Sequence, residues 1–124
     1  MTVPGANDHL EQGRANRTHA EWLLVMSPYE PTVRQWAVTA VFYSALHAMT
    51  AYLVNQGIVT KNHSARARAL ANLTSGVPSP VLSAYRVLED RSRAARYDLA
   101  AFTVRDVRHL IDQHLAVVAA FTGM

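Results

Sequence analysis

The chain has 124 residues, which is enough for one domain and leaves no room for a second independent core. Hydrophobic residues make up 50% of it and charged residues 17%, so it can bury a core and is not a disordered segment. The formal net charge is +3, and the lack of cysteine excludes disulfide frameworks, thiolate metal sites and cysteine nucleophiles. We therefore expect residues 1–124 to form a single domain.

The N-terminal segment predicts a helix and no secretory signal. Residues 1–8 are polar and lack a basic region followed by an apolar run, so we expect a cytoplasmic protein. A first helix is expected after Asn7 or Asp8 as N-cap and should run to about Met26, because Ser27–Pro28 breaks it.

A second, long helix is expected from Pro31 to Asn55–Gln56, with Gly57 ending it. Its apolar residues fall on nearly every side, which is typical of the central helix of a bundle or of a helix that also packs on a second subunit. Together with Trp22 and Trp36 as candidates for exposed apolar positions, this favours a homodimer.

The same segment is long enough to raise the question of a membrane. No charged residue occurs between Arg34 and Lys61, and a bilayer requires roughly 20 apolar residues. No cluster of Lys or Arg favours one end of the segment, and five polar side chains interrupt it, namely Thr39, Ser44, His47, Thr50 and Asn55. We therefore expect no membrane partner.

Three further helices follow. The third is expected from Asn62 or Ser64 to about Leu73, and Ser79–Pro80 should cap the fourth. In the fourth, helical spacing connects the apolar residues Val81, Leu82, Tyr85, Leu88, Ala95 and Leu99.

Thr103 and Asp106 have the spacing of a capping box, which predicts a last helix from Val104 to about Phe121. Its inner face would consist of Val107, Leu110, Ile111, Leu115 and Val118. Because no segment alternates as a strand does, the predicted fold class is all-α, an antiparallel four- or five-helix bundle.

Three polar segments occur in order on this scaffold: Phe42–His47, then Asn62–Ser64 with Arg66, and then Arg91–Asp98. With Gly57 between the first two, they resemble the prokaryotic HEPN domain. Its members often read Tyr-Tyr-Ala-x-Phe-His-Ala-x-x-Ala-Leu-Leu on one helix, followed by a Thr-His-Ser-like turn and later by an Arg-x-x-Ala-Asp-Tyr-like segment. The resemblance covers roughly residues 30–121.

The resemblance implies a helical bundle, commonly a homodimer. Such proteins occur as RNA-cleaving toxins, as partners of small nucleotidyltransferases in toxin-antitoxin pairs, and as defence-system components. RNA-cleaving members carry an Arg followed after four to six residues by a His, but Arg91, Arg93 and Arg96 have no His within that reach. Two pairs elsewhere meet the spacing, Arg14 with His19 and Arg108 with His114, and chance alone would give about as many. An ideal helix would place the side chains of Arg108 and His114 about 240° apart.

Two histidines are candidate catalytic residues. His47 lies inside the second helix, where a partly buried imidazole with a lowered pKa could move a proton on a ribose hydroxyl. The alternative is a hydrogen-bonded core or interface residue. His63 stands at the start of the third helix, where Lys61 and Arg66 complete a phosphate-binding end; alternatively, His63 or Asn62 only caps the helix.

Residues 61–96 contain seven Lys or Arg and two acids, an excess of positive charge that indicates an anionic partner. Arg93 and Tyr97 are one helical turn apart and suit stacking on a base. The candidate phosphate- or RNA-binding residues are Lys61, His63, Arg66, Arg93, Arg96 and Tyr97. The alternative is ordinary surface ion pairing within the helix, Arg86 with Asp90 and Glu89 with Arg93.

Asp106, His109 and Asp112 recur at three-residue steps, but a solvated polar helix face explains them, so we expect no metal and no cofactor. Three functions remain open. The first is a module that binds RNA, a nucleotide or an acidic partner in a toxin-antitoxin or defence context. The second is a metal-independent endoribonuclease toxin with a relocated catalytic His, in which Arg93 or Arg96 stabilises phosphate charge. The third is a structural protein-interaction subunit. Because only the second of these functions is enzymatic, enzymatic activity stays an open question. A nucleotidyltransferase antitoxin or a defence-system protein is a candidate partner.

Overall fold

A computed structural model describes residues 3–26, 29–72 and 76–124, and over these ranges the protein is all-α and contains no strand. The predicted fold class is thus confirmed. The helices are α1 (Ala6–Met26), α2 (Pro31–Asn55), α3 (His63–Asn72), α4 (Ser79–Tyr97), and a last continuous rod made of α5 (Val104–His109), a π-helical turn, η1 (Leu110–Leu115), and α6 (Ala116–Thr122).

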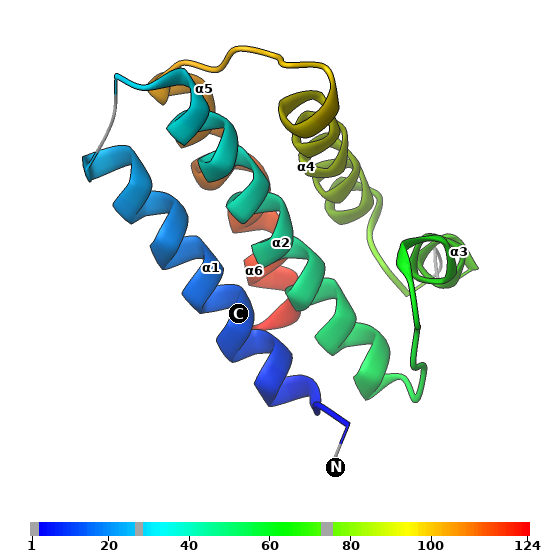
Figure 1. Ribbon diagram of the computed structural model, residues 1–124. Coiled ribbons are helices and arrows are strands. Elements are labelled where there is room, and N and C mark those ends of the chain that lie inside the picture. Colours follow the sequence, from blue (N-terminus) through cyan, green and yellow to red (C-terminus); the bar gives the residue numbers. More distant parts are fainter. Residues whose placement is uncertain (1–2, 27–28, 73–75) are drawn as a thin grey trace.

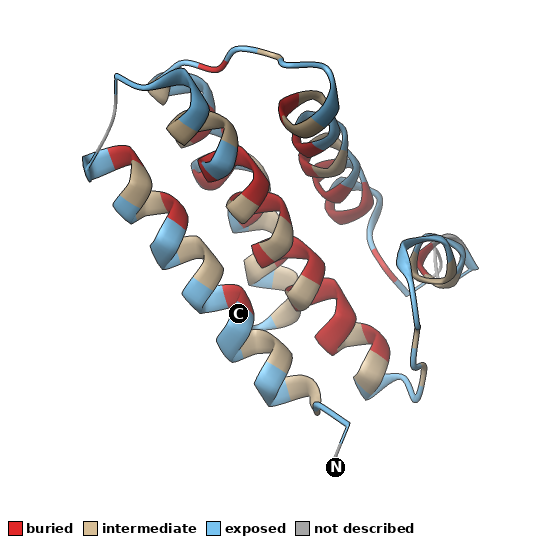
Figure 2. Ribbon diagram, in the orientation of Figure 1, coloured by how far each residue is buried: buried red, intermediate tan, exposed pale blue. Residues whose placement is uncertain are grey.

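Figure 1 shows α1, α2, α4 and the last rod running alternately up and down as an antiparallel bundle, with α3 to one side. The α2 helix occupies the centre, between α1 and α4 and in front of the last rod. Its side chains are buried along most of its length (Figure 2), and Phe42, Met49 and Leu53 are almost fully enclosed. The nearly all-round apolar pattern therefore reflects a central helix.

The α2 helix is long and apolar enough, by length and composition, to cross a membrane. However, 72% of its most apolar window is buried inside the protein. Packing by the other helices of the bundle accounts for this apolar surface, as it does in any core helix.

Two predicted helix starts need correction. The α1 helix begins at Ala6, before either predicted N-cap residue. Asp8 lies inside the first turn, where its Oδ2 accepts a 2.8 Å hydrogen bond from the Gly5 N–H, so it is not the N-cap. At α4 the cap residue is Pro78 and no side chain caps the helix, so the role expected of Ser79 is wrong. By contrast, the start predicted for α3 is confirmed, since Asn62 Oδ1 accepts from the Ala65 N–H at 2.8 Å.

The C-terminal end of α2 agrees with the prediction, whereas that of α4 does not. The α2 helix ends as expected, with Gly57 in the left-handed region at φ 78°. The helical spacing predicted to reach Leu99 is wrong, because α4 ends at Tyr97 and Leu99 lies beyond it with φ 54° and a 79% exposed side chain. The predicted break at Ser27–Pro28 and the predicted end at Leu73 lie outside the described residues.

The capping box that was predicted to start the last helix is confirmed. The Asp106 N–H donates to Thr103 Oγ1 at 3.0 Å, and the Thr103 N–H donates to Asp106 Oδ2 at 2.8 Å. The five residues of its predicted inner face are all buried. What the sequence did not indicate is the π-helical turn of η1, which changes the side-chain register in the middle of the rod.

The α1 and α2 helices approach each other closely at Gly13. Ser44 Oγ donates a 2.6 Å hydrogen bond to the Gly13 carbonyl, and the Met124 side chain packs over the same point. The Arg14 side chain also donates to the carbonyls of Gly123 and Met124, at 3.2 and 3.0 Å. These contacts fix the register between α1 and α2, and that register places the N-terminal turn of α1 beside the second half of α2.

Candidate functional site

Two histidines from different helices meet at this end of the bundle. His9 Nδ1, in α1, lies 3.0 Å from His47 Nδ1, in α2, and the two rings stack with their centroids 5.3 Å apart. A hydrogen bond at this distance requires that one Nδ1 carries a proton and the other offers a lone pair. At least one ring of this imidazole pair (His9 and His47) is therefore neutral.

Arg66 of α3 is near enough to the imidazole pair to act electrostatically on both rings. Its Nε donates to Thr50 Oγ1 at 3.1 Å, and its Nη1 lies 3.4 Å from His63 Nδ1. The Thr50 hydroxyl in turn donates to the Leu46 carbonyl at 2.7 Å, so it is held in place as an acceptor for the guanidinium. Side chains of α1, α2 and α3 thus converge on one small region that carries a fixed positive charge.

Both rings of the imidazole pair favour the neutral form. Burial, followed by the charge of Arg66, lowers the pKa of His9, although Asp8 opposes the shift. Burial also lowers the pKa of His47, and His9 and then Arg66 add to this effect. An anion bound beside the rings would oppose these influences, because it favours the protonated imidazole.

A groove of about 620 Å³ runs between α1 and α2 and reaches the imidazole pair at His47. Aromatic and polar side chains contribute to its walls, among them Gln12, Asn16, His19, Trp36 and Tyr43. Trp36 is 61% exposed, which leaves much of its ring open to a ligand. We call this hollow the α1–α2 groove.

A second cationic group adjoins the groove at Tyr43. Arg96 of α4 donates from Nη1 to Tyr43 Oη at 3.2 Å, and its guanidinium carbon lies 5.7 Å from the Tyr43 ring centroid and 5.2 Å from that of Tyr97. A smaller hollow of about 380 Å³, lined by Trp36 and Arg96 among others, continues from this point. The polar surface therefore extends from α1 across α2 to α4.

The structure distributes the residues that the sequence singled out over these two groups. His47 belongs to the imidazole pair, Arg66 acts electrostatically on both of its rings, and His63 contacts Arg66. Arg96 and Tyr97 lie near Tyr43. Lys61 and Arg93 are exposed, and in the described part of the chain neither side chain forms a hydrogen bond or ion pair with either group.

The surface ion pairs expected along α4 do not form. Among the described residues, Glu21 takes part in both ion pairs, with Arg17 at 3.2 Å and with Arg108 at 3.7 Å. The basic excess of residues 61–96 is thus left without ion-paired acids in the described part of the chain. Nor does any group of three or more His, Asp or Glu side chains there lie close enough together to hold a metal ion.

Sequence reasoning missed His9, Thr50 and the two amides of Gln12 and Asn16. Nothing in the spacing along the chain connects His9 with His47, because 38 residues separate them. The two amides are one turn apart on α1, and Gln12 Nε2 donates to Asn16 Oδ1 at 3.1 Å. Their spacing in the sequence does predict that they share one helix face, but only the structure shows that this face borders a groove.

The sequence model of the HEPN domain matches residues 6–122, from the first residue of α1 to the last of α6. The chain belongs to the HEPN domain family. The match includes α1, which the resemblance over residues 30–121 had left out, so His9 and the α1–α2 groove are part of the HEPN domain. No curated protein and no solved structure matched the chain closely enough to support a comparison.

Proposed function

We propose that this HEPN domain binds single-stranded RNA along the α1–α2 groove. The observation that carries the proposal is the contact between the imidazoles of His9 and His47, whose pKa values are both lowered. This contact lies within the electrostatic influence of Arg66 and at the end of a groove with aromatic walls. A phosphate group suits the first part of this arrangement, and an unpaired base suits the second.

The phosphate is expected at the imidazole pair. A phosphodiester oxygen can accept from an imidazole N–H and from the Arg66 guanidinium, and such charge-assisted hydrogen bonds are about twice as strong as neutral ones. Because Arg66 is held by Thr50, little side-chain entropy is lost when it meets the phosphate. Binding should weaken steeply with salt, as phosphate contacts do.

The bases are expected to stack on the aromatic walls. Trp36 is exposed and Tyr43 is braced by Arg96, so both rings offer a face to an unpaired base. The amides of Gln12 and Asn16 lie along the opposite wall and have donors and acceptors for base edges. Such a site selects single strands, because the bases of a duplex are stacked and paired.

The setting proposed for this binding rests on family membership alone. The protein would act in the cytoplasm as a homodimer, within a toxin-antitoxin or defence system that includes a nucleotidyltransferase antitoxin or another defence protein as its partner. The purely structural subunit is the weaker alternative, because a docking surface for a protein does not require a half-buried pair of imidazoles in contact.

The binding is tested by fluorescence anisotropy with a labelled single-stranded oligoribonucleotide in EDTA, at low and moderate salt. Arg66→Gln should weaken binding about tenfold or more, because it removes a charged hydrogen-bond donor. Arg68→Gln is the matched control: it removes the same charge from an exposed position of the same helix. Equal losses in the two variants would show that only overall charge matters and would contradict the site.

A second function, cleavage of the bound RNA, is favoured by one specific observation, the presence of two imidazoles where one would serve for binding. One ring would take the proton of a ribose 2′-hydroxyl while its oxygen attacks the adjacent phosphorus. The other would give a proton to the departing 5′-oxygen, which leaves a 2′,3′-cyclic phosphate and a 5′-hydroxyl end. Arg66 would stabilise the charge that develops on the phosphate.

This second function is tested in the same mixture by following RNA length in EDTA. Cleavage that disappears in His9→Ala and in His47→Ala but persists in His63→Ala would support it, because His63 is exposed and is not a member of the imidazole pair. Intact RNA with salt-dependent binding would leave the binding module as the function. Cleavage that survives both His9→Ala and His47→Ala would overturn the role of the imidazole pair.

A further inference from the structure

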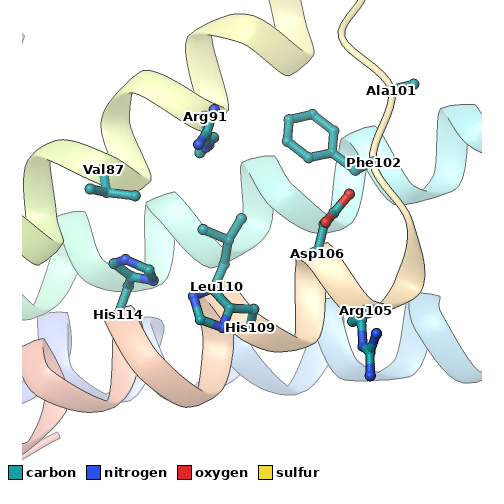
Figure 3. A pocket seen from close by; sticks show the side chains of 9 residues that line it. All are labelled: Val87, Arg91, Ala101, Phe102, Arg105, Asp106, His109, Leu110 and His114. Atoms are coloured by element: carbon teal, nitrogen blue, oxygen red, sulfur yellow. The ribbon is translucent and has the colours of Figure 1, made fainter.

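A separate hollow of about 690 Å³ lies between α4 and the last rod, and its lining includes Val87, Arg91, Phe102, Asp106, His109 and His114. None of these residues lines the α1–α2 groove. Figure 3 shows Asp106 beside Phe102 at one end and His114 beside Val87 at the other, with Arg91 reaching down from α4 between them. The volume is within the range of small-molecule sites.

The π-helical turn explains why two histidines share this hollow. Residues five apart, such as His109 and His114, point about 140° apart on an α-helix. A π-helix, with its i→i+5 hydrogen bonds, is wound less tightly and brings residues five apart much closer to the same face. Here the two rings meet edge to face with their centroids 5.3 Å apart, so the turn gathers both imidazoles on one wall. Single π-helical turns within α-helices occur frequently at functional sites.

One of these rings has an unused hydrogen-bonding atom. His114 Nδ1 is buried and has no hydrogen-bond partner of normal geometry in the described part of the chain. Burial, followed by the charge of His109, lowers the pKa of His114, and the nearby His109 carbonyl opposes this shift only in part. A buried polar atom without a partner destabilises the free protein, and a rotation of the ring that turned this nitrogen toward the hollow would let a ligand oxygen satisfy it.

The charges around the two rings favour an anion at this end. Arg91 is exposed, acts electrostatically on His114, and stands across the hollow from both imidazoles. Arg105 also borders the hollow, but its guanidinium points away from the imidazoles in Figure 3. The single acid, Asp106, sits at the far end, and one of its oxygens already accepts from the Thr103 N–H.

We propose that this hollow binds a small phosphorylated molecule, with the phosphate held by Arg91, His109 and His114. A guanidinium and two imidazole N–H donors from two different helices can surround the three terminal oxygens of a phosphomonoester. The organic part of the molecule then lies along Val87 and Phe102 toward Asp106, whose carboxylate can accept from a hydroxyl or amino group. This site does not depend on the proposed RNA groove.

The test is an NMR titration of the full chain with phenyl phosphate, following the imidazole signals of all six histidines. Saturable shifts of His109 and His114 are expected. Arg91→Gln should weaken binding about tenfold or more, as loss of a charged donor does. Arg93→Gln, an exposed position two residues away on the same helix, should leave it unchanged. Absence of saturation at these rings, or equal weakening in both variants, would overturn the proposal.

The source of the phosphate is distinguished in a second arm. The His47→Ala variant, in which the groove is disabled, is titrated with a short oligoribonucleotide that carries either a 5′-phosphate or a 5′-hydroxyl. Shifts of His109 and His114 with the phosphorylated strand alone would support the site with an RNA terminus as its ligand. Shifts with phenyl phosphate but with neither strand would support it with a free small molecule. Equal shifts of both rings with the two strands would show that the phosphomonoester is not recognised and would overturn the proposal.

Discussion

His9 and His47 share a hydrogen bond 3.0 Å long although 38 residues and a helix reversal separate them. The bond ties the first turn of α1 to the second half of α2, within the electrostatic influence of Arg66 of α3. Protonation of both rings would remove the lone pair on which this bond depends and would add two positive charges to the field of Arg66. The pair therefore links the packing of α1 to the protonation state of the site.

The first prediction is that the protein loses stability as pH falls below about 6.5. The pKa of His9 and that of His47 are lower in the folded protein than the ordinary value of 6.5, so the unfolded chain takes up protons first on acidification. The stabilisation is complete above 6.5 and is lost as pH falls toward the folded pKa values. His114, whose pKa is also lowered, adds to the effect.

Thermal unfolding between pH 5 and 8 measures this loss. In a variant that carries His9→Gln and His47→Gln, the midpoint temperature should depend less on pH over this range, because only His114 of the three shifted rings remains. The His63→Gln variant serves as a control, since His63 is an exposed ring outside the pair. A midpoint that rises on acidification from pH 7 to 5.5 would contradict the prediction.

Much of the fold followed from local rules in the sequence. Thr103 and Asp106 defined the start of the last rod, and Gly57 and Asn62 marked the boundaries of α2 and α3, because caps and left-handed turns are set by a few adjacent residues. The π-helical turn of η1 was not predictable in this way, since a continuous apolar pattern does not reveal one inserted residue in the hydrogen-bonding register.

The site followed from the sequence only in part. His47 and Arg66 were recognisable because each stands among residues that match a family pattern, and both lie at the candidate site. His9 was not, because its place depends on how α1 slides along α2, which the approach at Gly13 decides. The hollow beneath Arg91 was missed since it needs both the π-helical turn and the path of the segment after α4.

The second prediction concerns the close approach at Gly13. A Cβ atom at this position would overlap the Met124 sulfur and lie 3.1 Å from the backbone carbonyl of Ser44. The end of the Met124 side chain can move, but the carbonyl belongs to the central helix. We therefore expect Gly13→Val to destabilise the protein by about 1–3 kcal/mol, the cost typical of overpacking. Ala15→Val, at an exposed position of α1, should cost less than 1 kcal/mol, roughly the difference in helix propensity.

Chemical denaturation of both variants gives these values, with the slope of the free energy against denaturant as a check on two-state behaviour. A second measurement separates strain from other causes: Met124→Ala should recover part of the loss in the Gly13→Val background, because it removes the overlapping sulfur. A Gly13→Val variant as stable as the wild type would show that α1 and α2 can move apart at no cost.

The third prediction is that Thr103→Ala destabilises the protein by about 1 kcal/mol, as loss of an N-cap does. The side chain is exposed, so the change leaves no cavity, and the loss comes from the hydrogen bond that the Asp106 N–H donates to Thr103 Oγ1. Thr103→Ser keeps the hydroxyl and should stay within about 0.5 kcal/mol of the wild type. Denaturant midpoints decide the matter, and equal midpoints for the Ala and Ser variants would mean that the cap does not stabilise the last rod.

The fourth prediction follows from the exposed apolar residues at the end of α1. Trp22, Val25 and Met26 are 52%, 71% and 60% exposed, and they follow one another within a little more than a helical turn. An exposed apolar surface of this kind favours association, and we propose that it forms the interface of a homodimer. Trp36, although similarly exposed, lines the α1–α2 groove and is expected to contact RNA instead.

Sedimentation at micromolar concentration tests this assignment. The wild type should sediment as twice the 13.7 kDa chain and Trp22→Glu as a single chain, because a buried carboxylate without a partner strongly disfavours the interface. Trp36→Ala is the reciprocal control: it should remain dimeric while its affinity for single-stranded RNA falls about fivefold to a hundredfold, the effect of losing one stacked base. A wild-type protein that sediments as a monomer would rule out the dimer, whereas the RNA measurement would still stand on its own. If instead Trp36→Ala dissociates the dimer and Trp22→Glu does not, the interface covers the groove, and the groove cannot then bind RNA in the dimeric state.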